Sequence, residues 1–246
     1  MFRLDEFALL LKSTPVLCQV GLTVDIKSTP KTLTLMLTHH SPRFVAALQM
    51  SNEFFNLFYC DETLHLRFSL EKFYVLMYQM ELQAYSLMHF TLLPELHAVF
   101  LTFEDYNSGQ KPRITTRQLD MLPYKVDQQL RIDYKAFVSI DSKDFKRVVL
   151  EISAHSSVYV ILSDSEAKFS NENKEIIFTK EERKCIIGGI KRRKEYEFVI
   201  TLDPLLFFLD LSYQAQRVWL FMQKDLSSIL VFPSGLWTQF WVYFCP

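Results

Sequence analysis

The last fifth of the sequence constrains the fold most, because it combines one apolar helix with short strands in a fixed order. Asp203 and Pro204 precede the apolar run Leu205–Leu209, which predicts a helix with Asp203 as its cap and proline at its first position. Alternating apolar residues then predict strands at 218–223, 228–232 and 240–244. A helix followed by several short strands is typical of an α+β fold.

The same order of elements recurs upstream. Helical patterns span 5–12, 69–77 and 142–152, and the last two begin at Ser69 and Ser142, which predict capping serines. Alternating runs predict strands at 33–37, 44–50, 64–68, 98–103, 113–119, 136–140, 158–162, 175–179 and 195–201. A strand, a helix and several strands thus occur about twice in each half. The polar stretch 120–133, which contains Pro123, predicts a linker between the halves.

Composition favours a folded chain with a large core. Of 246 residues, 49% are hydrophobic and 15% aromatic, which suits one large domain or two smaller ones. The five glycines form no GxGxxG or P-loop pattern, and we interpret Gly188-Gly189 as a turn. The net charge of −1 excludes a uniformly basic nucleic-acid binder, so any DNA contact must come from a local patch. No apolar run reaches the roughly 18 residues that span a bilayer.

Residue spacings predict neither a metal site nor a catalytic centre. The four cysteines form no CxxC pair, and the six histidines form no HExxH pattern. His39 and His40 are adjacent on a predicted strand, so their side chains point to opposite faces. The sequence also lacks GxSxG. Acidic residues directly after Met1-Phe2-Arg3-Leu4 argue against a signal peptide, which predicts reduced thiols in the cytosol or nucleus.

Several segments keep a common order and spacing along most of the chain. They are Phe54–Asp61 (F-x-x-Y-x-C-D in the pattern that they match), Gln129–Tyr134, Asp144–Arg147, Ala167–Ser170 (V-K-F-S) and Tyr243–Pro246 (Y-L-A-P). From Leu202 onward the match has no gap. As a set, they resemble the proliferating cell nuclear antigen (PCNA) family of eukaryotic DNA sliding clamps, with Gln129–Tyr134 in the place of the family's interdomain connector. The resemblance is best from about Phe44 onward.

This resemblance implies an α+β fold with two similar sliding-clamp domains per chain, antiparallel sheets outside and helices inside. It predicts an N-terminal clamp domain at 1–118, a connector at 119–135 and a C-terminal clamp domain at 136–246. Such chains close as a homotrimeric ring that encircles duplex DNA without reading its sequence. The expected function is that of a processivity factor for DNA polymerase and a docking platform for replication and repair proteins, loaded by a clamp loader in the nucleus. No membrane, metal, cofactor or catalytic residue is expected.

The resemblance also assigns three sets of residues. A pocket for partner peptides would be formed by Phe44, Leu130, Ile132, Tyr134, Leu226, Phe244, Cys245 and Pro246. Residues facing DNA would be Lys12, Lys72, Lys143, Lys146 and Arg147, of which the last three share one helix face. The subunit interface would pair 113–119 of one chain with 175–179 of the next, with Ile114, Ile176 and Phe178 as its apolar residues.

The chain departs from the family in several places. The connector is shorter after Ile132, and Val75, Tyr78 and Asp210 occupy helix positions that match lysines of the family. Pro15 and Pro30 interrupt the poorly matching N-terminal part, so we expect a short opening helix. The basic run Lys191–Lys194 falls in an outer loop of the family, where it is a solvated loop, a nuclear import signal or a phosphate contact.

Two other functions stay open at this point. Depleted basic charge and the short connector are consistent with a specialised clamp, such as one subunit of a heterotrimeric checkpoint clamp. A metal-dependent nuclease would need clustered carboxylates to hold magnesium, and the sequence has no evident cluster of this kind.

Overall fold

The computed structural model describes residues 1–105, 112–123, 136–152, 157–222 and 227–244. The predicted α+β class with antiparallel sheets is confirmed. The chain divides into two compact units: unit 1 comprises Met1–Leu37 and Ala47–Asp127, and unit 2 comprises Thr38–Ala46 and Gln128–Pro246. Within the described ranges, no helix is both long and apolar enough to cross a membrane.

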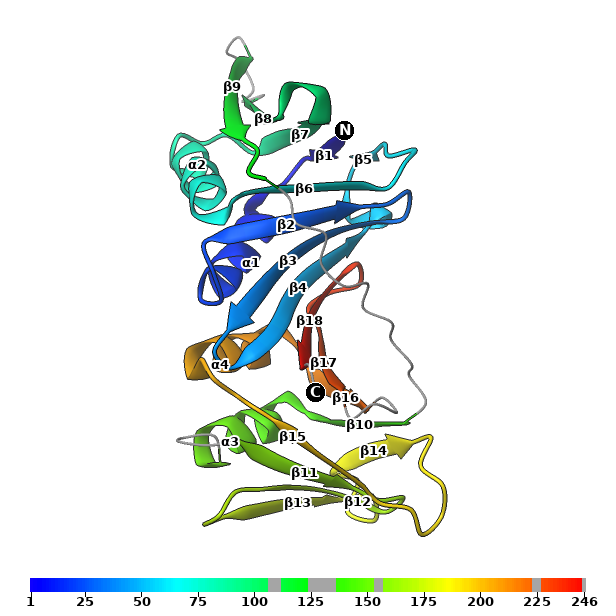
Figure 1. Ribbon diagram of the computed structural model, residues 1–246. Helices are drawn as coiled ribbons and strands as arrows, with labels where there is room; N and C mark the ends of the chain where they lie inside the picture. Colours follow the sequence, from blue (N-terminus) through cyan, green and yellow to red (C-terminus); the bar gives the residue numbers. More distant parts are fainter. Residues whose placement is uncertain (106–111, 124–135, 153–156, 223–226, 245–246) are drawn as a thin grey trace. The chain divides into compact units, whose positions relative to one another are not determined.

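Helices and short strands alternate along the chain (Figure 1). The helices are α1 (Ala8–Cys18), α2 (Leu70–Leu82), α3 (Ser142–Ile152) and α4 (Leu205–Gln214), with 3-10 turns η1 (Asn52–Phe54) and η2 (Pro94–Leu96). The first strands are β1 (Phe2–Leu4), β2 (Thr23–Ser28), β3 (Thr32–His40), β4 (Arg43–Ser51), β5 (Leu57–Phe58), β6 (Leu64–Ser69), β7 (Leu87–Leu93), β8 (Ala98–Asp105) and β9 (Arg113–Asp120). The later strands are β10 (Ala136–Asp141), β11 (Val158–Leu162), β12 (Glu166–Ser170), β13 (Glu175–Thr179), β14 (Cys185–Gly188), β15 (Tyr196–Ile200), β16 (Arg217–Met222), β17 (Ser228–Pro233) and β18 (Thr238–Phe244).

Both halves of the chain have the same order of elements. Among the described residues, a strand, a helix, five strands, a second helix and three strands run from β1 to β9, and this order returns from β10 to β18. The pairing repeats as well. β1 pairs with β5 and β7, as β10 pairs with β14 and β16, and β2 pairs with β3 and β6, as β11 pairs with β12 and β15. The recurrence read from the sequence is therefore present in the strand topology.

Unit 1 places its helix pair against its sheets. One sheet has the order β5-β1-β7-β8-β9, and strands β4-β3-β2-β6 follow one another in the other. α1 and α2 pack against each other, and α2 also contacts β2 and β9. Large aromatic rings fill the space between these layers, for example Phe68 against Phe73 at 5.4 Å between ring centroids. The fully buried phenylalanines of this unit are Phe2, Phe7, Phe68, Phe73 and Phe103.

Helix α1 is longer than the sequence predicts. The expected helix ended near Lys12 because Pro15 follows, but α1 continues through Pro15 to Cys18. A proline inside a helix costs about 3 kcal/mol, since it lacks an N–H and its ring crowds the preceding turn. The hydroxyl of Thr14 donates to the carbonyl of Leu10 at 2.8 Å, and the apolar side of α1 is buried, which offsets this cost. Its buried residues are Leu10, Leu11, Thr14, Val16 and Leu17.

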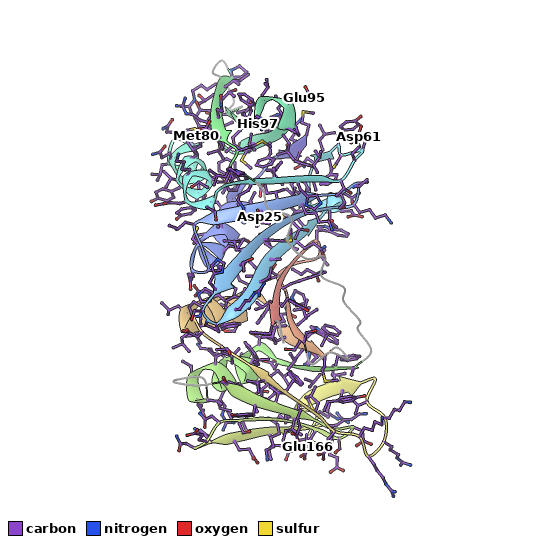
Figure 2. All side chains as sticks on the ribbon, viewed as in Figure 1. Asp25, Asp61, Met80, Glu95, His97 and Glu166 are labelled. Carbon is purple, nitrogen blue, oxygen red and sulfur yellow. The ribbon has the colours of Figure 1, made fainter. Side chains whose placement is uncertain are left out.

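An ion pair across two strands helps to fix the register of unit 1. Asp25 on β2 (Figure 2) lies directly opposite Arg67 on β6. The two oxygens of Asp25 accept hydrogen bonds from Nε and Nη2 of Arg67 at 2.5 and 2.6 Å. Because this fork-shaped contact is mostly shielded from water, a slip of one residue would separate two charges that are poorly hydrated.

Unit 2 repeats the arrangement. Strands β14-β10-β16-β17-β18 follow one another in one sheet, and the other has the order β13-β12-β11-β15. α3 packs against α4 and contacts strands of both sheets, namely β10, β12 and β16 (Figure 1). The fully buried phenylalanines of this unit are Phe44, Phe145, Phe169, Phe207, Phe208, Phe232 and Phe240.

The helix starts differ in part from the predicted caps. Ser69 caps α2, since its hydroxyl accepts a hydrogen bond from the backbone N–H of Lys72 at 3.2 Å. In α3 the predicted cap Ser142 is wrong: its buried hydroxyl donates to the carbonyl of Ser212 in α4, and Asp141 accepts from the N–H of Lys143 at 2.9 Å instead. Asp203 was also predicted wrongly, because Pro204 occupies the N-cap position of α4 and leaves that helix without a side-chain cap in the described structure.

The Gly188-Gly189 pair is both a strand end and a turn. Gly188 is the last residue of β14 and lies opposite Phe137 on β10. A Cβ atom at Gly188 would stand 2.6 Å from two carbons of the Phe137 ring, so any larger residue would force that ring to shift. Gly189 has a φ of 76°, a left-handed conformation that favours glycine. The predicted turn is therefore confirmed at Gly189, and Gly188 serves close packing.

Candidate nucleic-acid and partner surfaces

The exposed face of the helix pair in unit 1 mixes apolar side chains with the polar residues Glu71, Gln79 and Glu81. Lys12 on α1 and Lys72 on α2, both predicted to face DNA, are exposed. Around them the helices present Leu9, Val75 and Leu82, with 55%, 41% and 69% of their surfaces exposed. Tyr78 lies on the same part of α2, 46% exposed, and stacks on Tyr74 with ring centroids 6.0 Å apart. This face therefore combines a low density of cations with a large apolar area.

The predicted basic cluster of unit 2 lies on one side of α3 but is partly neutralised. Arg147 Nε lies 3.0 Å from a carboxylate oxygen of Glu151, one helical turn away, and Lys174 Nζ lies 2.5 Å from the other oxygen. The hydrogen bond from Lys174, followed by that from Arg147, lowers the pKa of Glu151 below its ordinary value. Lys143, at the start of α3, is exposed. Lys143 is thus better placed than Arg147 for a new anionic partner.

Lys146 makes a contact that sequence reasoning missed. Its ammonium lies 4.3 Å from the ring centroid of Tyr213 on α4 and donates a hydrogen bond to the hydroxyl of that tyrosine. Tyr213 is 67% exposed, and Leu206, two helical turns earlier on α4, is exposed to the same degree. The exposed side of α4 carries no lysine or arginine, as the sequence of Leu205–Gln214 requires. On the helix pair of unit 2 the cations therefore come from α3, and α4 contributes apolar side chains, Asp210 and a phenol.

The two strands predicted to form the subunit interface lie at sheet ends. In the described chain, β9 pairs with β8 and β13 pairs with β12, and each ends its sheet. A strand in this position offers unpaired backbone N–H and carbonyl groups to another chain. Ile114 on β9 is 60% exposed, as an interface residue must be before assembly.

Alternation on β13 distinguishes residues that sequence reasoning grouped together. Ile176 and Phe178 are only 4% and 3% exposed and point into the core of unit 2, where Phe178 packs edge-on against Phe169 at 5.9 Å. Ile177 between them is 43% exposed. Successive side chains of a strand point to opposite faces. The exposed apolar side chain of β13 is therefore Ile177, whereas Ile176 and Phe178 pack in the core.

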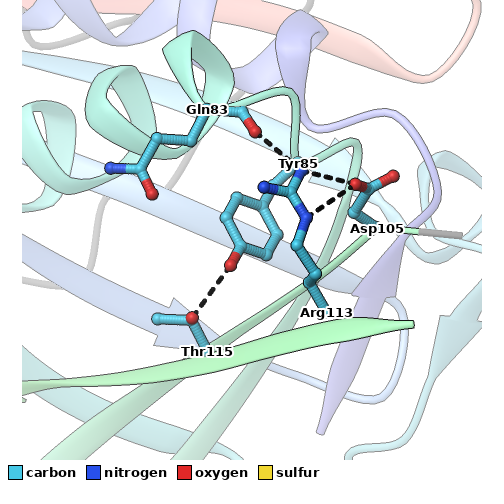
Figure 3. A network of polar contacts seen from close by, with 5 residues as sticks. All are labelled: Gln83, Tyr85, Asp105, Arg113 and Thr115. Atoms are coloured by element: carbon cyan, nitrogen blue, oxygen red, sulfur yellow. Dashed lines mark hydrogen bonds and ion pairs between the residues drawn. The ribbon is translucent and has the colours of Figure 1, made fainter. Parts of the chain in front are cut away.

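A polar network anchors the start of β9 to the end of α2 (Figure 3). Nη2 of Arg113 donates to the buried carboxylate of Asp105 at 2.5 Å and to the carbonyl of Gln83 at 3.0 Å. The guanidinium also lies 5.1 Å from the ring centroid of Tyr85, whose hydroxyl shares a hydrogen bond of 3.0 Å with Thr115. Hydrogen bonding to Asp105 raises the pKa of Arg113 above its usual range. These contacts anchor one end of β9, the last strand of its sheet, to the end of α2.

Phe44 and Phe244 of the predicted peptide pocket lie in the core of unit 2. Phe44 is 0% and Phe244 6% exposed. The ring of Phe44 lies 5.9 Å from those of Phe207 and Phe208 and 6.1 Å from that of Phe244, centroid to centroid. Neither ring is accessible to a peptide. The other predicted pocket residues fall outside the described residues: Leu130, Ile132, Tyr134, Leu226, Cys245 and Pro246.

The opposite face of β18 presents partly exposed aromatic side chains. Trp241 and Tyr243 alternate with the buried Val242 and Phe244 and are half-buried. Across the same sheet, Trp219 on β16 lies 5.5 Å from Phe137 on β10, between ring centroids. The indole N–H of Trp241 has no hydrogen-bond partner in the described structure. Period-two spacing along β18 could have identified Tyr243, in place of Phe244, as the accessible aromatic residue of this strand.

Of the remaining sequence signals, the basic run lies on the surface and His39 is half-buried. Lys191–Lys194 is exposed in the loop between β14 and β15. His39 bonds through Nδ1 to the carbonyl of Pro42 at 2.8 Å, and its ring stacks on Phe44 at 4.8 Å. Among the described residues, no group of three or more histidine, cysteine, aspartate or glutamate side chains is arranged to hold a metal ion.

Comparisons with known protein families and with curated proteins find no match to this sequence.

Proposed function

We propose that this chain is a subunit of a DNA sliding clamp of the PCNA type. Three copies form a closed ring around duplex DNA, with the helix pairs toward the hole and the sheets outside. The ring keeps a polymerase on its template and serves as a docking platform for replication and repair proteins. Its action is topological, so it needs no catalytic residue or cofactor. A clamp loader would open the ring, and the expected location is the nucleus.

The repeated order of elements is the observation that carries this proposal. Both units have the same order of strands and helices, and each packs one helix pair against its sheets. Two such units in one chain can supply equivalent segments of a ring. This repetition agrees with the segments from Phe54 to Pro246 that resemble the clamp family.

The sheet ends support a head-to-tail joint between copies. β9 ends a sheet of unit 1, and β13 ends the other type of sheet in unit 2. A joint between two different strands is heterologous, so every copy keeps one free end for the next copy until a ring closes. Ile114 and Ile177, both exposed, supply apolar area on these strands.

Partner peptides would dock on the side of β18 that carries Tyr243. Aromatic and aliphatic anchors of a client suit an apolar surface because buried area supplies most of the binding free energy. The connector residues Leu130 and Ile132 would complete the pocket. Their replacement by alanine should weaken the binding of a clamp-binding-motif peptide in fluorescence anisotropy while the oligomer mass stays constant, and unchanged affinity would remove them from the pocket.

One observation favours the alternative that this chain belongs to a heterotrimeric, checkpoint-type clamp. Its helix faces present few unpaired cations, and Arg147 is already engaged by Glu151. Other subunits could then supply the positive charge. In that case the purified chain would remain a monomer, since each of its ends would fit a different companion.

Mass and topology test the proposal together. Light scattering after size exclusion should give about 87 kDa, three times the chain mass of 29.1 kDa. The trimer should then thread onto linear duplex DNA with a biotin at each end. Once streptavidin blocks both ends, the protein should resist removal by high salt, and it should be lost when a restriction enzyme opens the duplex. A trimer that high salt strips from blocked DNA would grip DNA rather than encircle it, and the proposal would fail.

A further inference from the structure

Two tyrosines occupy corresponding positions in the repeated architecture. α2 and α4 are the second helices of their units, and each packs against the first helix of the same unit. Tyr78 lies eight residues after Leu70, the first residue of α2, and Tyr213 lies eight residues after Leu205, the first residue of α4. Both are exposed, at 46% and 67%. The two helix pairs therefore present a phenol at the same place.

Apolar side chains adjoin both tyrosines, together with one acidic residue each: Glu81 three residues after Tyr78, and Asp210 three residues before Tyr213. On α2, Val75 and Leu82 flank Tyr78 at helical spacings of three and four residues, and both are exposed. On α4, Leu206 and Leu209 lie on turns that precede Tyr213. A tyrosine side chain has an apolar ring, which packs on the neighbouring apolar residues, and a hydroxyl group, which can form a hydrogen bond with a partner.

The contact with Lys146 prepares the hydroxyl of Tyr213 to donate. Its oxygen accepts a hydrogen bond from the ammonium of Lys146, which also lies 4.3 Å from the ring centroid. The phenolic proton is then directed away from the lysine, and hydrogen bonds in a chain strengthen one another. Lys146 and Tyr213 together offer a positive charge and a neutral donor at one point, which suits a phosphate group.

We infer that Tyr78 and Tyr213 contact the phosphate backbone of the encircled duplex, each donating its hydroxyl proton to a phosphate oxygen. This inference rests on the proposed clamp function and names the residues by which its helix faces meet DNA. Tyrosine is an established donor to phosphate in protein–DNA contacts. Because a phenol is uncharged, its contact releases no counterion, and binding through it depends weakly on salt. The helix faces thus hold DNA with few cations.

Phenylalanine substitutions test the inference, since they remove only the hydroxyl groups. Binding of the trimer to a short fluorescein-labelled duplex is followed by anisotropy over a series of potassium chloride concentrations. Tyr78→Phe combined with Tyr213→Phe should weaken binding about tenfold, as the loss of two hydrogen bonds requires. The slope of log affinity against log salt should stay that of the wild type, whereas Lys143→Ala with Lys146→Ala should reduce it by about one to two units.

Tyr159→Phe is the matched control. Tyr159 on β11 is 53% exposed, like the helix tyrosines, but it alternates with Val158 and Val160, which face the core. Its substitution should leave the affinity unchanged. Equal affinity of the wild type and the double phenylalanine variant would overturn the inference, and so would a weakened variant with an altered salt slope. Failure of the clamp function itself would appear separately, as loss of the wild-type trimer or of its retention on end-blocked DNA.

Discussion

Replacement of Phe44 by alanine distinguishes a core residue from a pocket residue. The ring is fully buried and lies within 6.1 Å of the rings of Phe207, Phe208 and Phe244, centroid to centroid. Removal of a buried phenylalanine ring leaves a cavity and costs about 3–5 kcal/mol. We therefore expect Phe44→Ala to lower the free energy of unfolding of unit 2 by about 4 kcal/mol. With a urea dependence of about 2 kcal/mol per molar, the midpoint should fall by about 2 M.

Tryptophan fluorescence reports this unfolding selectively. The three tryptophans of the chain, Trp219, Trp237 and Trp241, all belong to unit 2, to which Phe44 also belongs. Val45→Ala is the matched control, because Val45 is half-buried and faces away from Phe207 and Phe208, so its loss should cost about 1 kcal/mol or less. A loss below about 1 kcal/mol for Phe44→Ala would refute the core assignment. Weaker peptide binding at normal stability would instead restore Phe44 to the pocket.

Other substitutions test the proposed subunit interface at β13, the ion pair of Glu151 and the close contact of Gly188 with Phe137. Ile177→Lys should reduce the trimer mass in light scattering without unfolding the chain. Phe178→Ala should instead lower the free energy of unfolding in urea by about 3–5 kcal/mol. The reverse pattern would contradict the faces assigned to β13. The pKa of Glu151 is lowered in the folded chain. The ionised carboxylate therefore stabilises the fold above the pKa of an unfolded glutamate, about 4.3, and this stabilisation is lost as the pH falls through the lower pKa of the folded state. Glu151→Gln should therefore lower the melting temperature at pH 6 but make little difference near pH 3, and an equal effect at both values would exclude the ion pair. Gly188→Ala should cost about 1–3 kcal/mol because its methyl group meets the Phe137 ring, and Phe137→Leu in the same chain should recover part of this loss.

The sequence predicts those elements of this fold whose apolar residues keep one period. Phe240–Phe244 alternates and forms most of β18, and 142–152 matches α3. β7 was missed because the apolar pairs Leu87-Met88 and Leu92-Leu93 at its ends obscure the alternation of Met88, Phe90 and Leu92 with His89 and Thr91. The end of α1 was missed because local propensity disfavours Pro15, and burial in the tertiary fold outweighs that preference.

The candidate surfaces were harder to predict than the fold. Lys12 and Lys143 are exposed as expected, because a charged side chain on a helix usually reaches water. The sequence could not show that Arg147 is held by Glu151, since Lys174, which shares that carboxylate, comes from a distant loop. It also could not separate Ile176 from Ile177, because the assignment of a strand's two faces depends on what packs against each.

The core position of Phe44 has a consequence for the order in which the chain can fold during its synthesis. Phe44 leaves the ribosome well before the rings that cover it, because Phe207 and Phe208 belong to α4 and Phe244 belongs to β18. Until these elements emerge, an aromatic side chain that will be fully enclosed stays open to water and to other nascent chains. Slow translation should therefore raise the demand for a chaperone, and the segment around Phe44 is where we expect that chaperone to bind.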